Sequence, residues 1–329
     1  MSAGPTGLYT IAPGRAFLTD LAQGVIERFG QGPDPLGLAA VTIFLPTRRA
    51  ARTLAEELTR AAGREALVLP RIVTLGDVDE DEAIIDPAAD LGSFAPEMPR
   101  LQRELLLAER IEAFRRDAGS SGGFAVSLAL ARDLARLLDE AANEDVDLSG
   151  LAALAPGDLA EHWRRTVDFL GVITQEWPDI LKRRNRLDPA ARRALLIRAY
   201  AARLERERPV APFIVAGSSG SIHATGDLMR VIAGLPNGAV VLDGLDAGLD
   251  AESWEALPPS HPQFALKELL IRLGADRLMA GPWTGSSDRP GPRAAFLSEA
   301  MRPPETADRW SERGKVAGLA NGVDGLTLI

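Results

Sequence analysis

The residues best suited to chemistry in this sequence are Thr47, Arg48, Arg49 and Arg52, which could hold phosphate groups. They follow Val41–Leu45, a short and mostly apolar run of the kind that a parallel sheet buries on both faces. Helix-forming residues come next, so the threonine is expected to cap a helix whose first turn carries the arginines. Arginines are unfavourable there unless an anion binds. The pattern predicts contacts to a nucleic-acid backbone, although a solvated helix start explains the same residues.

A second turn lies where an ATP-binding loop would be expected, after the first predicted strand. Leu8–Leu18 is typical of strand, turn and helix, and its turn contains Pro13, Gly14 and Arg15. A P-loop ends in Gly-Lys-Ser/Thr, because amides cradle phosphate, the lysine neutralises charge and the hydroxyl holds magnesium. The first lysine of this chain is Lys182. We therefore predict a degenerate nucleotide site without hydrolytic activity.

The strand that would carry magnesium-binding acids is altered as well. Phe213–Ala216 runs into Gly217–Gly220 and has no carboxylate at its end. The next apolar strand is followed by Asp243 and Asp246, which could bind a metal or form a turn. The chain has no cysteine and only three histidines, so we predict no metal site and no thiolate-held cluster.

The order of several short motifs carries a family resemblance. Pro46–Arg52 resembles the motif with which superfamily 1 helicases contact single strands: a hydrophobic strand, then Thr-x-x-Ala-Ala and a helix. Together with Leu69–Asp81, Phe213–Ile222 and His261–Phe264, it is similar to the N-terminal part of AddB-type subunits in their alphaproteobacterial form. These are the B subunits of AddAB-type helicase–nucleases that repair double-strand breaks. The resemblance runs along nearly all of the chain.

This resemblance implies an α/β fold, a parallel-sheet RecA-like domain of the superfamily 1 helicase type with an inserted helical subdomain. The expected domains are a discontinuous α/β domain at 1–95 and 208–280, the helical subdomain at 96–207, and a linker with the start of a further, truncated domain at 281–329. The degenerate P-loop departs from the family, whose members keep a Walker A sequence.

The resemblance also implies a function in DNA end processing during double-strand break repair and recombination. The expected partners are single-stranded DNA, DNA ends and an AddA-type helicase–nuclease subunit. ATP with magnesium and an iron–sulfur cluster belong to the full complex, so no cofactor and no catalytic residue is assigned to this chain. An active ATPase and a scaffold that binds only the partner subunit are the rival functions.

A dinucleotide-binding enzyme is the alternative from another class. Gly217–Gly226 follows a predicted strand, and Asp243 lies at the end of the next strand, as in dinucleotide-binding folds. However, the glycine spacing is not Gly-x-Gly-x-x-Gly. Neither Tyr9 nor Tyr200 is followed four residues later by a lysine, which excludes a tyrosine–lysine reductase.

The region between the halves of the expected sheet is rich in leucine at helical spacing. Its aromatic residues Trp163, Phe169 and Trp177 could stack on bases or simply pack helices together. Its basic cluster Lys182–Arg186 could contact phosphate or form a solvated face. Both alternatives stay open for each group.

Composition limits the remaining possibilities. The 329 residues are 46% hydrophobic, enough for one large or two ordinary domains. The net charge of −9 argues against a surface coated with nucleic acid and allows a local basic track. Because no apolar run reaches membrane-spanning length and no signal peptide is evident, we predict a cytoplasmic protein without a membrane contact.

Overall fold

The computed structural model describes residues 7–30, 36–63, 67–75, 94–117, 119, 123–148, 169–285, 291–311 and 322. Contacts within the chain divide it into two compact units, which are described separately below. One unit comprises Met1–Ile85, Ala199–Ser221 and Thr225–Ile329, and the other comprises Asp86–Arg198 and Ile222–Ala224. The inserted helical subdomain stays a prediction.

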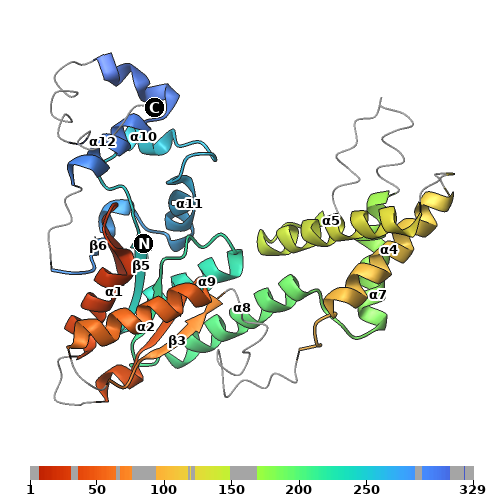
Figure 1. Cartoon of the computed structure of the whole chain (residues 1–329), viewed down its shortest axis with the longest axis horizontal. Helices are drawn as coiled ribbons and strands as arrows, with labels where there is room; N and C mark the ends of the chain where they lie inside the picture. The colour runs from red at the N-terminus through yellow and green to blue at the C-terminus, as the bar shows by residue number, and fades with distance from the viewer. Residues whose placement is uncertain are drawn as a thin grey trace. The chain divides into compact units, whose positions relative to one another are not determined.

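The first unit contains a sheet of six strands that are all parallel, in the order β3-β2-β4-β5-β1-β6 (Figure 1). This arrangement confirms the predicted α/β class and is consistent with a RecA-like parallel-sheet domain. The strands are β1 (Leu8–Ile11), β2 (Thr42–Leu45), β3 (Arg71–Thr74), β4 (Phe213–Ala216), β5 (Gly238–Asp243) and β6 (Gly281–Pro282).

Strand β2 is an inner strand because its apolar residues fill both faces of the sheet. Ile43, Phe44 and Leu45 are fully buried, as expected for a parallel strand covered on both sides. The register places Thr42 opposite Phe213 of β4, and β3 pairs along the other edge of β2. The predicted strand before the arginines is therefore confirmed.

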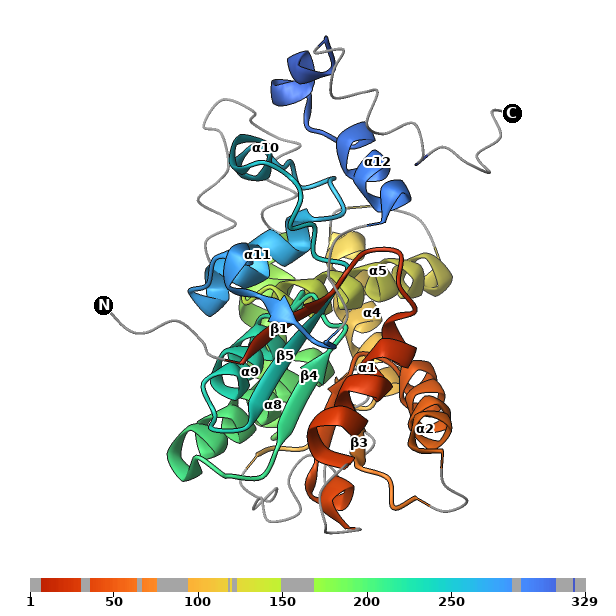
Figure 2. The same cartoon turned by 90° about the vertical axis from the view of Figure 1, so that its left-hand side faces the viewer.

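Helices cover both faces of this sheet. On one face, α1 (Phe17–Val25) and α2 (Arg48–Ala62) bury Leu21 and Leu54 in a cluster with Ile43. On the other face lies α9 (His223–Ala233), and Figure 2 shows the strands between it and the pair α1 and α2. Helix α8 (Pro189–Glu207) begins at its proline, and its Tyr200 ring packs 6.0 Å from Phe44.

The edge strand β6 was not expected from the sequence, which indicated a linker from Gly281 onward. Instead, Gly281 and Pro282 pair with β1, and the next residue, Trp283, is 1% exposed. The indole Nε1–H of Trp283 donates to the carbonyl of Leu21 at 3.1 Å. The linker prediction was therefore wrong at its start, because an edge strand accepts glycine and proline and the tryptophan gains a core position.

Arg28 holds this edge from the outside. Its guanidinium carbon lies 4.4 Å from the ring centroids of both Tyr9 and Trp283, a cation–π arrangement. The same guanidinium donates to the carbonyl oxygen of Trp283 at 2.9 Å. The short strand β6 is thus fixed by side chains as well as by its ladder.

The second unit is built on helices α4 (Arg100–Asp117), α5 (Phe124–Asn143) and α7 (Trp177–Arg183). Trp177 is 1% exposed and its Nε1–H donates to Asp188 at 2.8 Å, so this tryptophan packs helices. Phe169 lies against Phe114, with ring centroids 5.5 Å apart. Trp163 lies outside the described residues. Packing, rather than base stacking, is therefore the observed role of Trp177.

A buried charge organises this helical unit. The Arg103 side chain is 5% exposed, and its guanidinium lies 2.8 Å from Asp188 and 2.9 Å from Asp139. Burial raises the pKa of Asp188 above its ordinary value, although the charge of Arg103 and the hydrogen bond from Trp177 act in the opposite direction. Arg103 thereby connects α4, α5 and the residue that precedes α8.

The C-terminal part of the first unit contributes further short helices. They are α10 (Ala251–Glu255), α11 (Phe264–Leu273), η7 (Arg277–Met279), α12 (Pro292–Ala300) and η8 (Pro304–Ser311), and near the N-terminus lie η1 (Ile26–Gly30) and η2 (Gly37–Ala40). The described helices include none with the length and apolar character needed to cross a membrane.

Replacing Gly24 with alanine should destabilise the sheet unit. The new methyl group would lie 2.2 Å from Trp283 Nε1, so the indole must shift, at a cost of about 1–3 kcal/mol for overpacking. Gly171→Ala is the matched control, because no atom lies within 4 Å of its added methyl group. Thermal unfolding followed by circular dichroism should show a lower Tm for Gly24→Ala only; equal Tm values would contradict this packing.

Arg103→Met should lower the free energy of unfolding of the helical unit by about 3–5 kcal/mol, because two carboxylates lose their buried partner. Arg132→Met is the control, since this half-exposed arginine pairs with Glu104, which keeps Arg100 as a second partner. We expect about 0–1 kcal/mol there. Urea unfolding monitored by circular dichroism measures both, and similar losses would show that Arg103 has no special role.

Candidate nucleic-acid interface and degenerate nucleotide site

The predicted phosphate-contacting residues lie at the start of α2, as expected. Thr47 has an extended backbone (φ −140°, ψ 151°), and its hydroxyl accepts a hydrogen bond from the Ala50 amide at 3.1 Å. The helix ends at Gly63, which adopts the left-handed conformation (φ 59°). Leu54 and Leu58 are fully buried and hold the helix on the sheet. Local capping and an apolar face thus position the arginines.

All four predicted residues, Thr47, Arg48, Arg49 and Arg52, are exposed. The first turn of α2 has no acidic residue. Within the part of the chain that the structure describes, Arg49 and Arg52 form no ion pair. The positive end of the helix therefore carries added positive charge that faces solvent, which is the arrangement that an anion would stabilise. Their role in DNA binding stays a prediction.

Sheet topology explains why this position suits a ligand. From β2 the chain moves to β3, whereas from β4 it moves in the opposite direction to β5. Because such crossovers are nearly always right-handed, the chain leaves β2 and β4 on opposite faces of the sheet. Ligands of open α/β sheets bind at such switch points, beyond the carboxyl ends of the strands. The start of α2 lies at this switch point.

A second switch point lies between β1 and β5, and it contains the turn that was predicted to be a degenerate nucleotide site. The turn after β1 includes Gly14 (φ 82°), and the Arg15 amide donates to the Ala12 carbonyl at 3.4 Å. The guanidinium of Arg15 pairs with Asp20 of α1. The cation in the place of a P-loop lysine is thus held by a carboxylate of its own helix. Pro13 adds no amide donor.

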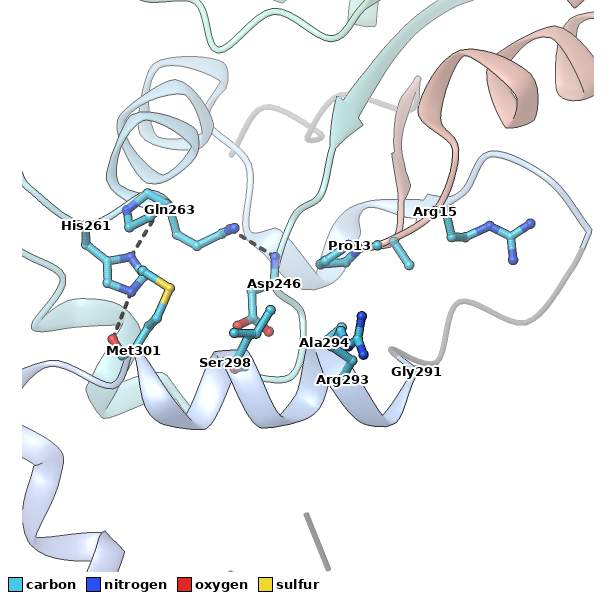
Figure 3. A pocket seen from close by; sticks show the side chains of 14 residues that line it. Pro13, Arg15, Asp246, His261, Gln263, Gly291, Arg293, Ala294, Ser298 and Met301 are labelled. Atoms are coloured by element: carbon cyan, nitrogen blue, oxygen red, sulfur yellow. Dashed lines mark hydrogen bonds between the residues drawn. The ribbon is translucent and has the colours of Figure 1, made fainter. Parts of the chain in front are cut away.

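A cleft of about 600 Å³ opens beside this turn. Its lining residues come from the turns after β1 and β5, from the start of α11 and from α12. In Figure 3 the side chain of Arg15 points away from Asp246 and from α12. The side chains that line the cleft include those of Pro13, Arg15, Asp246, His261, Gln263, Arg293, Leu297, Ser298 and Met301.

Gln263 braces the floor of the cleft. Its side-chain amide donates to the Gly244 carbonyl at 2.9 Å, and its carbonyl oxygen accepts from the Asp246 amide at 3.0 Å. The backbone amide of Gln263 donates to Nδ1 of the His261 ring at 3.1 Å. The other ring nitrogen, Nε2, therefore carries the proton and donates to the backbone carbonyl of Met301 at 3.0 Å. This residue pair links the β5 turn to α12 (Figure 3).

Asp243 ends β5, and Asp246 lies in the turn that follows it. Oδ1 of Asp246 accepts from the amides of Gly248 and Leu249 at 2.9 and 3.1 Å, which is a turn. Burial raises the pKa of the Asp243 carboxyl above its ordinary value, although part of this side chain is exposed. Among the described residues, no cluster of three metal-binding side chains occurs. Of the two alternatives for Asp246, the turn is observed.

The glycine-rich turn at Gly217–Gly226 makes room for this protein's own side chains. A methyl group added to Gly217 would lie 3.0 Å from the Phe17 ring, and one added to Gly220 would lie 2.7 Å from Leu269. At Gly226 the neighbour is Arg272, 2.7 Å away. Strands β4 and β5, which would form the dinucleotide-binding unit, are adjacent and parallel. The dinucleotide alternative stays a prediction, although the protein's own side chains lie against these glycines.

Comparisons of the chain with protein-family models and with curated proteins give no match. The motif resemblance therefore has no further support from these comparisons.

The C-terminal helix α12 is anchored through a pairing that the sequence did not indicate. Arg302, which directly follows α12 and its C-cap, is 9% exposed and pairs with Asp250, the cap of α10, and with Glu299. Burial opposes ionisation of Asp250, but hydrogen bonds from Arg302 and Ser253 outweigh it and lower the pKa of Asp250 well below its usual range. No local pattern reveals this pair, because its members are 52 residues apart in sequence.

Acid should loosen this anchor. A carboxyl whose pKa is lowered by folding stabilises the protein above its ordinary pKa of 3.8, and this contribution disappears as the pH falls below that value. We expect the protection of the α12 amides, measured relative to their intrinsic exchange rate at each pH, to fall below pH 3.8 in the natural protein. Asp250→Asn should show faster exchange already at pH 7. Unchanged α12 protection in this variant would mean that the pair does not anchor the helix.

Proposed function

We propose that this chain is a non-catalytic, helicase-like module of an AddB-type subunit. It acts in the cytoplasm in double-strand break repair and recombination, where it holds single-stranded DNA during the processing of DNA ends. The observation that carries the proposal is the exposed set Thr47, Arg48, Arg49 and Arg52 at the start of α2, beyond the carboxyl end of a parallel strand.

The geometry of α2 supports backbone contact rather than reading of bases. Helix N-termini offer amide donors to anions, and arginine guanidinium groups match the paired oxygens of a phosphate. Backbone contacts fix the position of a strand without selecting its sequence. A module of this kind holds DNA of any sequence, and its affinity falls steeply with salt.

The absence of a P-loop sequence supports a non-catalytic role. Pro13 and Arg15 occupy the turn after β1, and Arg15 pairs with Asp20. By the family resemblance, ATP hydrolysis belongs to the partner, an AddA-type helicase–nuclease subunit, and this chain docks to it. The cleft beside the turn is braced by Gln263, and the turn lacks the lysine and the following hydroxyl that a P-loop supplies.

The double variant Arg48→Ala, Arg49→Ala should bind single-stranded DNA more weakly than the natural chain. Each lost phosphate contact on a single strand reduces the slope of log K against log salt by about 0.7, so two contacts reduce it by about 1.4. Fluorescence anisotropy of a labelled oligothymidylate, titrated at several salt concentrations, measures both affinity and slope.

Arg60→Ala is the control on the same helix. Arg60 lies in the last turn of α2 and pairs with Glu57, so its loss changes the charge without touching the helix start. We expect almost unchanged binding for Arg60→Ala. Equal affinity and slope for the double variant and the natural chain would refute the assignment of α2, and a natural chain that binds only the partner subunit would favour the scaffold alternative.

A further inference from the structure

The helical unit contains a basic hollow that the proposed function does not use. The hollow has a volume of about 370 Å³ and lies between the middle of α4 and the end of α7. Ile180 is a buried residue of the apolar core of this unit, and the partly buried Leu106 packs against that core. The lining residues are Leu106, Glu109, Arg110, Ile180, Arg183 and Arg184.

The cations of this hollow differ from most other arginines of α4 and α5. Arg110, Arg183 and Arg184, which line the hollow, and the adjacent Lys182 are exposed and form no ion pair with the described residues. Glu109, the acidic residue at the hollow, is exposed and likewise forms no ion pair there. Five of the six other arginines on α4 and α5 have carboxylate partners, namely Arg100, Arg103, Arg115, Arg132 and Arg136, and Arg116 is the exception among the described residues.

This contrast matters because the chain has more acidic than basic residues, 46 against 37. A group of four exposed cations without a carboxylate partner among the described residues produces a local positive field on an acidic protein. Fields of this kind attract anions and raise their rate of association.

The backbone keeps these cations in place. The Arg184 amide donates to the Ile180 carbonyl at 3.1 Å, and the Asn185 amide donates to the Lys182 carbonyl at 3.1 Å, which closes the end of α7. Arg186 donates to the Glu97 carbonyl at 3.2 Å and fixes the segment that follows. Cations are favourable at a helix C-terminus, so the protein tolerates this cluster without carboxylate partners.

We propose that this hollow binds phosphate groups of single-stranded DNA, as a second contact surface of the chain. The inference rests on the proposed function and adds to it a binding site on the helical unit. Arg110, Arg183 and Arg184 approach the hollow from two helices, and guanidinium forks hold phosphate oxygens in pairs. Leu106 and Ile180 supply apolar lining, and the three guanidinium groups outnumber the one carboxylate at the hollow, that of Glu109.

The test uses the full chain and a labelled oligothymidylate, with anisotropy measured over a range of salt concentrations. The variant Arg183→Ala, Arg184→Ala should bind more weakly, with a salt slope smaller by about 1.4, since two contacts are removed. The control Arg136→Ala, Arg206→Ala removes the same charge from exposed positions outside the hollow and should bind almost as the natural chain does. Circular dichroism confirms that all variants are folded.

The outcomes separate this site from the one on α2. If the natural chain binds DNA and the α7 variant matches it in affinity and slope, the hollow is not a DNA contact and the α2 assignment is unaffected. If the α7 variant binds more weakly and the Arg48→Ala, Arg49→Ala variant binds as the natural chain does, the assignment of the hollow is supported and the assignment of α2 is refuted. If the natural chain binds no DNA, both proposals fail.

A competition arm distinguishes DNA from a free nucleotide as the source of phosphate. Unlabelled oligothymidylate should displace the probe from the natural chain. ATP at the same phosphate concentration should displace it much less, because one nucleotide spans one site only. Equal displacement by ATP would overturn the assignment to a DNA backbone.

Discussion

The handedness of the crossovers in an all-parallel sheet is the constraint on which the rest of this structure depends. Because each connection returns the chain to the same end of the sheet, the turns after β1, β2, β4 and β5 meet at one edge. The strand order then creates switch points beside β1 and beside β2. The candidate phosphate-binding residues and the degenerate nucleotide turn lie at these points for that topological reason.

Side-chain packing determines which residues occupy the space at the carboxyl ends of these strands, and the residues differ from one strand to the next. Beside β1, a cleft is lined by α12 and braced by Gln263, while Arg15 is held by Asp20. Beside β4, Phe17 and Leu269 fill the space next to the glycines. At the start of α2, exposed arginines face solvent. The start of α2 is therefore the switch point at which exposed arginines lie beyond the carboxyl end of a strand.

Arginine has two distinct uses in this acidic chain. Arg103 and Arg302 are buried, and each joins separate helices through carboxylates. Such pairs fix one arrangement of the helices, because removing one partner leaves a buried charge. Arg49 and Arg183, by contrast, are exposed on helix termini and have no such partner among the described residues. The exposed arginines without carboxylate partners lie on two surfaces, the start of α2 and the hollow between α4 and α7.

The sequence by itself determined the buried strand β2, the Thr47 cap, the arginines of the first helical turn and the loss of the P-loop. These features are local, since capping, strand burial and motif chemistry depend on neighbouring residues. The linker predicted from Gly281 was misread at its start from the same kind of local signal. Tertiary structure alone decided that Trp283 packs against Gly24, that Arg302 forms an ion pair with Asp250, and that Arg110 and Arg183 line the same hollow. Those pairs are distant in sequence, and only the folding of the chain brings their side chains together.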